Sequence, residues 1–133
     1  MKRVIFTSFF LLASILMVCA EGMAEIKFEK TKHNFGIFSE SNPKVSCTFK
    51  FKNVGDGPLI IHQALASCGC TVPTYPKEPI KAGESGEIHV TYDGYGRFPG
   101  HFRKRITIRT NGSKEITHLF IEGEMTTKAA DIK

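Results

Sequence analysis

Two cysteines separated by a single glycine form the pattern in this sequence with the clearest chemical use. Cys68 and Cys70 are two positions apart, so on an extended strand both sulfurs would point to the same side. Gly69 would let the backbone pucker and a small disulfide ring close, and strained disulfides are easily reduced. Alternatively, two thiolates could bind a soft metal ion together with His62 or His101. The metal signal is weak, because one C-x-C pattern lacks the second cysteine pair of an established zinc site. The third alternative is a purely structural disulfide.

A further cysteine, Cys47, has a different setting. In the alternating segment 45–51, Cys47 falls on the same side of the expected strand as the apolar residues. This position predicts a buried thiol that behaves as a small apolar side chain. Three cysteines follow residue 24, so at most one internal disulfide can form, and Cys47, Cys68 and Cys70 are all candidates for a disulfide or redox role. An antibody-type bridge is excluded, because residues 100–110, the expected sixth strand, contain no cysteine.

No group of residues has the spacing of a catalytic set. The sequence lacks a G-x-S-x-G nucleophile elbow. Glu122 and Glu124 fall at the end of an expected strand, where they would be solvated, and a cysteine–histidine pair could involve only Cys68 or Cys70. The histidines are scattered, mostly at outward strand positions: His33, His62, His89, His101 and His118. We therefore expect a protein that is not an enzyme and that needs no cofactor.

The N-terminal residues have the composition of a secretory signal peptide. Two basic residues follow Met1, and residues 4–18 carry no charge and are rich in Phe, Leu and Ile. This run is shorter than the roughly 20 residues of a membrane span. Small residues precede two candidate cleavage points, after Ala20 and after Ala24. We expect residues 1–24 to be a signal peptide and the mature chain to be periplasmic or associated with the cell envelope.

Cys19 adds an alternative to simple export. A cysteine directly after the apolar run is where a bacterial lipoprotein takes its lipid, and Leu16 fits the −3 position of such a site. Val18 fits poorly, because a small residue usually precedes that cysteine. We therefore expect contact with a membrane only if Cys19 is lipidated.

The charge balance is modest. The net charge is +5, and removal of the leader with its two basic residues lowers it to +3, which argues against a nucleic-acid partner. Arg103, Arg105 and Arg109 share one strand face, and Arg97 lies just before that strand. Together with Lys50 or Lys52 of a neighbouring strand, this face could bind an anionic glycan, a lipid headgroup or an acidic protein. The alternative is an ordinary hydrated face of an antiparallel sheet.

Most of the 133-residue chain alternates between apolar and polar side chains with the period of β-strands. After segment 45–51, the candidate strands are residues 59–65, 67–72, 87–92, 100–110 and 115–123, with 26–28 and 34–37 as a broken first strand. Short strands with frequent turn signals predict an all-β fold, an immunoglobulin-like antiparallel β-sandwich of seven to eight strands over residues 25–124. Residues 125–133 are expected to form a polar C-terminal tail.

The turn after the clearest strand has a motif of its own. Asn53, Gly55 and Asp56 stand among residues that tolerate a positive φ. If Gly55 has a positive φ, a valine in its place should destabilise the protein by about 1–3 kcal/mol. The motif is therefore expected to join two strands as a hairpin.

These residues together make the sequence resemble a bacterial family of exported proteins. The resemblance is carried by residues 51–59, by Ser67-Cys68-Gly69-Cys70-Thr71, by Pro79-Ile80 with Gly83 and Gly86, and by Tyr92, Gly100-His101-Phe102 and Asn111. The family is the domain of unknown function fifteen-seventy-three, which is similar to immunoglobulin-like domains of the HYDIN and major-sperm-protein type. The resemblance implies a small β-sandwich at the bacterial envelope, without a known activity. It matches Cys68 and Cys70 to the family's Cys-Gly-Cys, and Asn53, Gly55 and Asp56 to its turn.

These observations favour a non-catalytic, exported interaction module of the cell envelope. Its partner would be another envelope protein, bound through a loop end, a sheet face or an edge strand. The alternative is a thiol-redox or soft-metal-binding domain that uses Cys68 and Cys70, with His62 as a further metal ligand.

Overall fold

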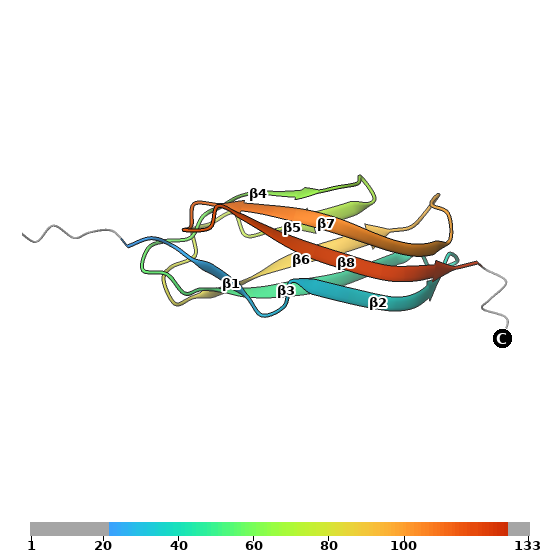
Figure 1. Ribbon diagram of the computed structural model, residues 1–133, viewed down its shortest axis with the longest axis horizontal. Helices are drawn as coiled ribbons and strands as arrows, with labels where there is room; N and C mark the ends of the chain where they lie inside the picture. Colours follow the sequence, from blue (N-terminus) through green and yellow to red (C-terminus); the bar gives the residue numbers. More distant parts are fainter. Residues whose placement is uncertain (1–21, 128–133) are drawn as a thin grey trace, which may run out of the picture.

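The computed structural model describes residues 22–127, and within that range it contains eight β-strands and no helix (Figure 1). In chain order the strands are β1 (Ile26–Phe28), β2 (Lys32–Ser39), β3 (Lys44–Asn53), β4 (Ile61–Ala66), β5 (Thr71–Thr74), β6 (Ser85–Asp93), β7 (Gly100–Thr110) and β8 (Ile116–Thr126). Over these residues no helix is long and apolar enough to cross a membrane. The expected cleavage point after Ala20, the candidate lipidation site Cys19 and residues 128–133 of the tail lie outside the described residues.

The strands form two four-stranded sheets that pack face to face. One sheet has the order β1-β3-β6-β5 and the other β2-β8-β7-β4. Side chains alternate between the two faces of each strand, so the period of two in the sequence becomes a division between core and surface. The prediction of an all-β, immunoglobulin-like sandwich is confirmed.

The first strand is divided between the two sheets. β1 pairs antiparallel with β3, the chain crosses over at residues 29–31, and β2 then pairs with β8 in the other sheet. The β2–β8 pairing is parallel, so the prediction of a purely antiparallel sandwich is wrong at this place. The reason is that the chain changes sheets without reversing direction, and β8 runs the same way as β2 (Figure 1).

The core lies between the inner faces of the four central strands. The β3–β6 and β7–β8 registers bring apolar side chains opposite one another on those faces. Among the described residues the large side chains with almost no exposure include Phe51, Leu59, Ile88, Val90, Ile106, Ile108, Leu119 and Ile121. Removing this apolar surface from water is the main force that stabilises the sandwich.

The C-terminal end of the sandwich extends further than the sequence pattern indicated. β8 continues to Thr126, and Met125 is only 2% exposed, so two residues assigned to the tail belong to the sheet. Met125 packs against Gly94, where a Cβ would lie 2.6 Å from the methionine sulfur. The sequence does not indicate this contact, because the residues around Met125 are polar.

The segment that contains the two cysteines is a turn. Residues 67–70 connect β4 with β5, and β5 begins only at Thr71, so the expected strand over 67–72 is wrong for most of its length. β5 pairs with β6 and lies at the edge of its sheet. Pro73 is tolerated there because an edge strand leaves half of its backbone groups without a neighbouring strand.

The expectation that the turn after β3 joins a hairpin is wrong, because β3 and β4 belong to different sheets. The turn is held in place by Asn53, a buried polar residue. Its side chain has no exposed surface. The amide Nδ2 donates to the carbonyl oxygens of Gly57 (2.8 Å) and Ile80 (2.9 Å). Oδ1 accepts from the backbone N–H groups of Glu25 (3.2 Å) and Gly55 (3.1 Å). The amide therefore makes the four hydrogen bonds that its two donors and two lone pairs allow.

Gly55 is needed in this turn for space. The expectation of a positive φ there is wrong, because the described glycines with a positive φ are Gly36, Gly83, Gly96 and Gly100. A Cβ on Gly55 would instead lie 2.7 Å from the carbonyl carbon of Ala24 and closer still to Met23. The Asp56 N–H donates to the carbonyl of Met23 (3.1 Å), so the N-terminal segment is bound tightly against the turn.

Candidate functional site

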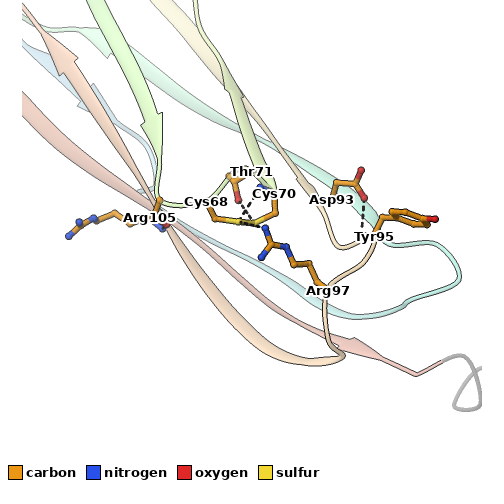
Figure 2. Close-up of a disulfide and its surroundings, with 8 residues drawn as sticks. Cys68, Cys70, Thr71, Asp93, Tyr95, Arg97 and Arg105 are labelled. Carbon is orange, nitrogen blue, oxygen red and sulfur yellow. Dashed lines mark hydrogen bonds between the residues drawn. A yellow bond between two sulfur atoms is a disulfide. The ribbon is translucent and has the colours of Figure 1, made fainter.

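A disulfide between Cys68 and Cys70 lies in the turn between β4 and β5 (Figure 2). The two Cα atoms are 5.2 Å apart, and the backbone N–H of Cys70 also donates to the Cys68 sulfur at 3.1 Å. The N–H of Thr71 donates to the Cys68 carbonyl at 3.2 Å, which closes the turn. The Cys-Gly-Cys spacing therefore forms a compact loop. A Cβ added at Gly69 would have no neighbouring atom within 4 Å.

The two sulfur-bearing residues differ in exposure. Cys70 is 6% exposed and belongs to the core cluster, whereas Cys68 is half-buried and packs at the margin of that cluster. The Cys70 sulfur lies 3.7 Å from the hydroxyl of Thr71. A reagent in solution therefore meets the disulfide from the Cys68 side.

A positive charge from a distant part of the chain lies beside the sulfur of Cys68, the less buried cysteine of the pair. The guanidinium of Arg97, in the connection between β6 and β7, donates to the Cys68 sulfur at 3.4 Å. Figure 2 shows Arg97 pointing at the disulfide, whereas the side chain of Arg105 points away from it. A guanidinium in this position stabilises a thiolate on Cys68 whenever the disulfide opens.

The disulfide encloses very little chain. Its cysteines are separated by two positions, and in the chain-entropy treatment such a loop contributes only about 1.5 kcal/mol to stability. A disulfide that closes a loop of 15 residues contributes about 3 kcal/mol by the same treatment. Opening the Cys68–Cys70 bond should therefore leave the sandwich folded, which a redox role requires.

Cys47 is the cysteine outside any disulfide in the described part of the chain. It lies on β3 opposite Val90, half-buried against the core cluster. Burial raises the pKa of the Cys47 thiol to about 11, because the charged form loses its hydration. Cys47 is therefore a protonated, unreactive thiol at neutral pH, as the strand parity indicated.

The structure does not assemble the proposed metal site. His62 lies at the start of β4, at the far end of that strand from the cysteine turn, and its carbonyl accepts a hydrogen bond from Tyr75. His101 approaches Glu122 instead, with 3.9 Å between Nε2 and Oε2. In residues 22–127 no group of three or more His, Cys, Asp or Glu side chains could hold a metal ion.

The connection between β6 and β7 displays two aromatic side chains. In this segment, residues 94–99, which we call the aromatic loop, Tyr95 is 84% exposed and Phe98 is 96% exposed. The loop is nevertheless well held: the N–H of Tyr95 donates to the Asp93 carboxylate (3.0 Å) and that of Arg97 to the Gly94 carbonyl (3.0 Å). In the sequence this segment lies between two expected strands, and of its residues only Arg97 was considered for a role. The missed signal is a pair of aromatic residues among glycines and proline, where polar residues are the rule.

The aromatic loop and the cysteine turn lie at the same end of the sandwich. The N–H of Asp93, the last residue of β6, donates to the Cys70 carbonyl at 2.8 Å. The N–H of Gly94 donates to the Pro43 carbonyl at 3.0 Å, which ties the loop to the connection between β2 and β3. These bonds hold three connections together at one end of the molecule: residues 40–43, 67–70 and 94–99.

The arginine row predicted on β7 is less continuous than expected. Arg103 lies over the ring of Phe120, with its guanidinium carbon 4.6 Å from the ring centre, and Arg109 pairs with Glu115 at 3.4 Å. Lys50 and Lys52 belong to β3 in the other sheet, so they cannot extend the row. On the β7 face, Arg103 and Arg109 therefore already have partners within the chain.

Two sheets with a divided first strand, and with connections gathered at one end, define an immunoglobulin-like β-sandwich of the PapD and major-sperm-protein type. The fold is similar to a protein of unknown function from Porphyromonas gingivalis W83, with a TM-score of 0.62 and 18% identity over 83% of this chain and 50% of that one. It is also similar to the ASH / PapD-like domain 7 of human CEP192, with a TM-score of 0.62 and 9% identity over 79% and 87% of the two chains. The MSP family member WR4 from C. elegans gives a TM-score of 0.52 and 9% identity over 78% and 98%.

Sequence comparison identifies the family. The model described as "Protein of unknown function (DUF1573)" matches residues 26–125, and the chain belongs to this family. The resemblance stated from the sequence motifs is thereby confirmed. The chain spans half the length of the P. gingivalis protein, and the structural similarities are evidence for the fold alone. No functionally curated protein matches the sequence.

Proposed function

We propose that this protein is an exported, non-catalytic module that binds another protein of the cell envelope through the aromatic loop. The observation that carries the proposal is the exposure of Tyr95 and Phe98 on a loop that backbone hydrogen bonds hold in place. Export itself rests on the leader-like composition of residues 1–24.

Exposed aromatic side chains are unfavourable unless they are covered by a partner. Complete burial of a large apolar side chain contributes about 1.5–3 kcal/mol. Aromatic residues are also enriched among the few interface positions that dominate binding energy. Because the aromatic loop is already ordered, its ordering adds little entropic cost to binding. The partner should therefore offer an apolar pocket, with a polar rim for the Tyr95 hydroxyl.

Site-specific crosslinking tests this proposal. A photoreactive phenylalanine analogue at position 98 should crosslink one envelope protein in the producing bacterium, whereas the same analogue at Ile116 should not. Ile116 is 40% exposed and begins β8, at the opposite end of the sandwich, so it controls for non-specific capture.

Binding measurements with the purified partner complete the test. The double substitution Tyr95→Ala and Phe98→Ala should weaken binding at least about tenfold, since two interface anchors are lost. Ile116→Ala should leave the Kd unchanged. A position-98 crosslink pattern no different from that at position 116, or a Kd unaffected by the double substitution, would rule out the aromatic loop as the docking surface.

A second candidate function is thiol–disulfide exchange at Cys68 and Cys70. The specific observation in its favour is the guanidinium of Arg97 beside the more exposed sulfur. The soft-metal form of this alternative has no third ligand near the cysteines among residues 22–127. Thiol counting after exposure of the purified protein to a dithiol tests the exchange function. A bond that a dithiol cannot open would argue for a purely structural disulfide.

A further inference from the structure

We propose that the Cys68–Cys70 disulfide oxidises dithiols in apolar polypeptide segments, with Cys68 as the sulfur attacked and Arg97 as the residue that stabilises its thiolate. This inference rests on the proposed thiol-exchange function, and it adds the direction of attack, the role of Arg97 and the class of substrate.

The first step follows from the difference in exposure. A substrate thiolate attacks the half-buried sulfur of Cys68, because the sulfur of Cys70 is enclosed in the core. A substrate–Cys68 disulfide forms as the Cys68–Cys70 bond breaks. The electron pair of the broken bond remains on Cys70, which takes up a proton, and the Thr71 hydroxyl at 3.7 Å can donate to that sulfur as it leaves.

The second step releases the oxidised substrate. The second substrate thiol loses its proton and attacks the substrate sulfur of the mixed disulfide, so a disulfide forms within the substrate. Cys68 leaves with the electron pair as a thiolate, beside the Arg97 guanidinium that already donates to its sulfur at 3.4 Å. The substrate has lost two electrons and two protons. The cysteine pair of the domain has gained both electrons and one proton, which Cys70 holds, and the other proton passes to water.

The substrate class follows from the loop that supplies Arg97. The same loop exposes Tyr95 and Phe98, and Tyr95 points away from the disulfide (Figure 2). An extended polypeptide bound at Cys68 that runs along the loop past Arg97 can therefore contact an apolar surface, whereas a small thiol at Cys68 does not reach it. A dithiol segment with apolar neighbours gains contact area there, whereas a small hydrophilic thiol does not. The preferred substrate is therefore an extended protein segment with two cysteines and apolar flanking residues.

Two synthetic peptides test the substrate class. Each contains two reduced cysteines, flanked either by leucine and phenylalanine or by serine, and each is mixed with the oxidised full-length protein. We expect one equivalent of peptide disulfide per protein, formed at least about threefold faster with the apolar peptide. Tyr95→Ala with Phe98→Ala should abolish that preference. Equal rates for the two peptides would overturn the assigned substrate class.

A monothiol version of the apolar peptide identifies the sulfur that is attacked. After the reaction is stopped with iodoacetamide, peptide mass spectrometry should find the peptide on Cys68 and the alkyl group on Cys70. A peptide found mainly on Cys70 would overturn the assigned direction of attack.

Alkylation of the reduced protein tests Arg97 separately from substrate binding. In Arg97→Gln, Cys68 should react with iodoacetamide at pH 7 about threefold to tenfold more slowly, with the pH profile moved upward and Arg97→Lys intermediate. Arg105→Gln is the matched control, because Arg105 lies beside the cysteine turn with its side chain directed away (Figure 2). An unchanged rate in Arg97→Gln would overturn the role of Arg97.

The outcomes separate this inference from the function on which it rests. If neither peptide is oxidised, the thiol-exchange function and the inference both fail. If the peptides are oxidised through Cys70, or equally well in Arg97→Gln, the exchange function stands and the inference fails.

Discussion

Replacing Asn53 with alanine should be among the most destabilising single changes in the protein. The substitution removes four hydrogen bonds. It leaves the buried carbonyl of Gly57 without its donor, whereas the carbonyl of Ile80 keeps its bond from the Leu59 N–H at 2.8 Å. A buried carbonyl left without a donor costs about 1–3 kcal/mol. The N–H groups of Glu25 and Gly55 are partly buried and can regain a bond to water at smaller cost. We therefore expect a loss of about 3 kcal/mol, mostly from the Gly57 carbonyl, which is a large share of the 5–15 kcal/mol that typically stabilises a domain.

Two comparison variants make this prediction specific to the hydrogen bonds. Asn53→Asp keeps the side-chain volume but places a carboxyl oxygen against two carbonyls, so it should destabilise the protein at neutral pH about as much as alanine. Asn111→Ala removes bonds to the Ile60 N–H (2.8 Å) and the Pro58 carbonyl (3.0 Å) at an exposed site. Water replaces those bonds, so the loss should be about 1 kcal/mol.

Urea unfolding at equilibrium measures these differences, provided that the slope with denaturant stays constant. A loss below about 1.5 kcal/mol for Asn53→Ala, or one equal to that of Asn111→Ala, would refute the reasoning from buried carbonyls. A stable Asn53→Asp variant would show that the volume of the side chain, rather than its donor, holds the turn.

Three further predictions concern neighbouring parts of the molecule. Gly55→Ala should destabilise the protein by about 2 kcal/mol because its Cβ overlaps the backbone of residues 23–25, whereas Gly69→Ala, which meets nothing within 4 Å, should leave the urea midpoint unchanged. Since burial raises the pKa of Cys47 to about 11 from a usual value of 9.0, the stability from its neutral thiol is complete below pH 9 and should fall between pH 9 and 11. That decline should be smaller in Cys47→Ala, where Tyr92, whose pKa burial also raises, still contributes to it. An identical pH profile in the two proteins would contradict the assignment. Finally, a protein that starts at Glu21 should unfold at a higher urea concentration than one that starts at Glu25. The shorter protein lacks the buried side chain of Ala24 and the carbonyls of Met23 and Ala24, which accept backbone hydrogen bonds. Equal midpoints would show that residues 21–24 do not stabilise the fold.

Much of the fold could be read from local patterns. The alternation in residues 45–51 matches the inward and outward faces of β3, and Ile106 and Ile108 on β7 are buried as their parity indicated. The parallel β2–β8 pairing could not be read in this way, because the alternation of a strand does not reveal which strand lies beside it. For the same reason Lys50 and Lys52 were assigned to the neighbourhood of an arginine row that lies on the other sheet.

The candidate site was accessible to sequence analysis only in part. The Cys-Gly-Cys spacing points to a close pair of sulfurs, but His62, considered as a third ligand, lies at the far end of β4. Arg97 could not be selected, because 29 residues separate it from Cys68 and no local pattern relates them. The exposure of Phe98 was also hidden, since an aromatic residue in a turn can equally fold back onto the core.

The amino-acid sequence by itself determined the family, the all-β class and the placement of most strands, because side-chain alternation and turn residues are local properties of the chain. Only the tertiary structure decided which strands pair, why Gly55 must be small, and that the aromatic loop brings a guanidinium to the exposed end of the disulfide. Those features depend on contacts between residues far apart in the chain, which form only when the two sheets pack against each other.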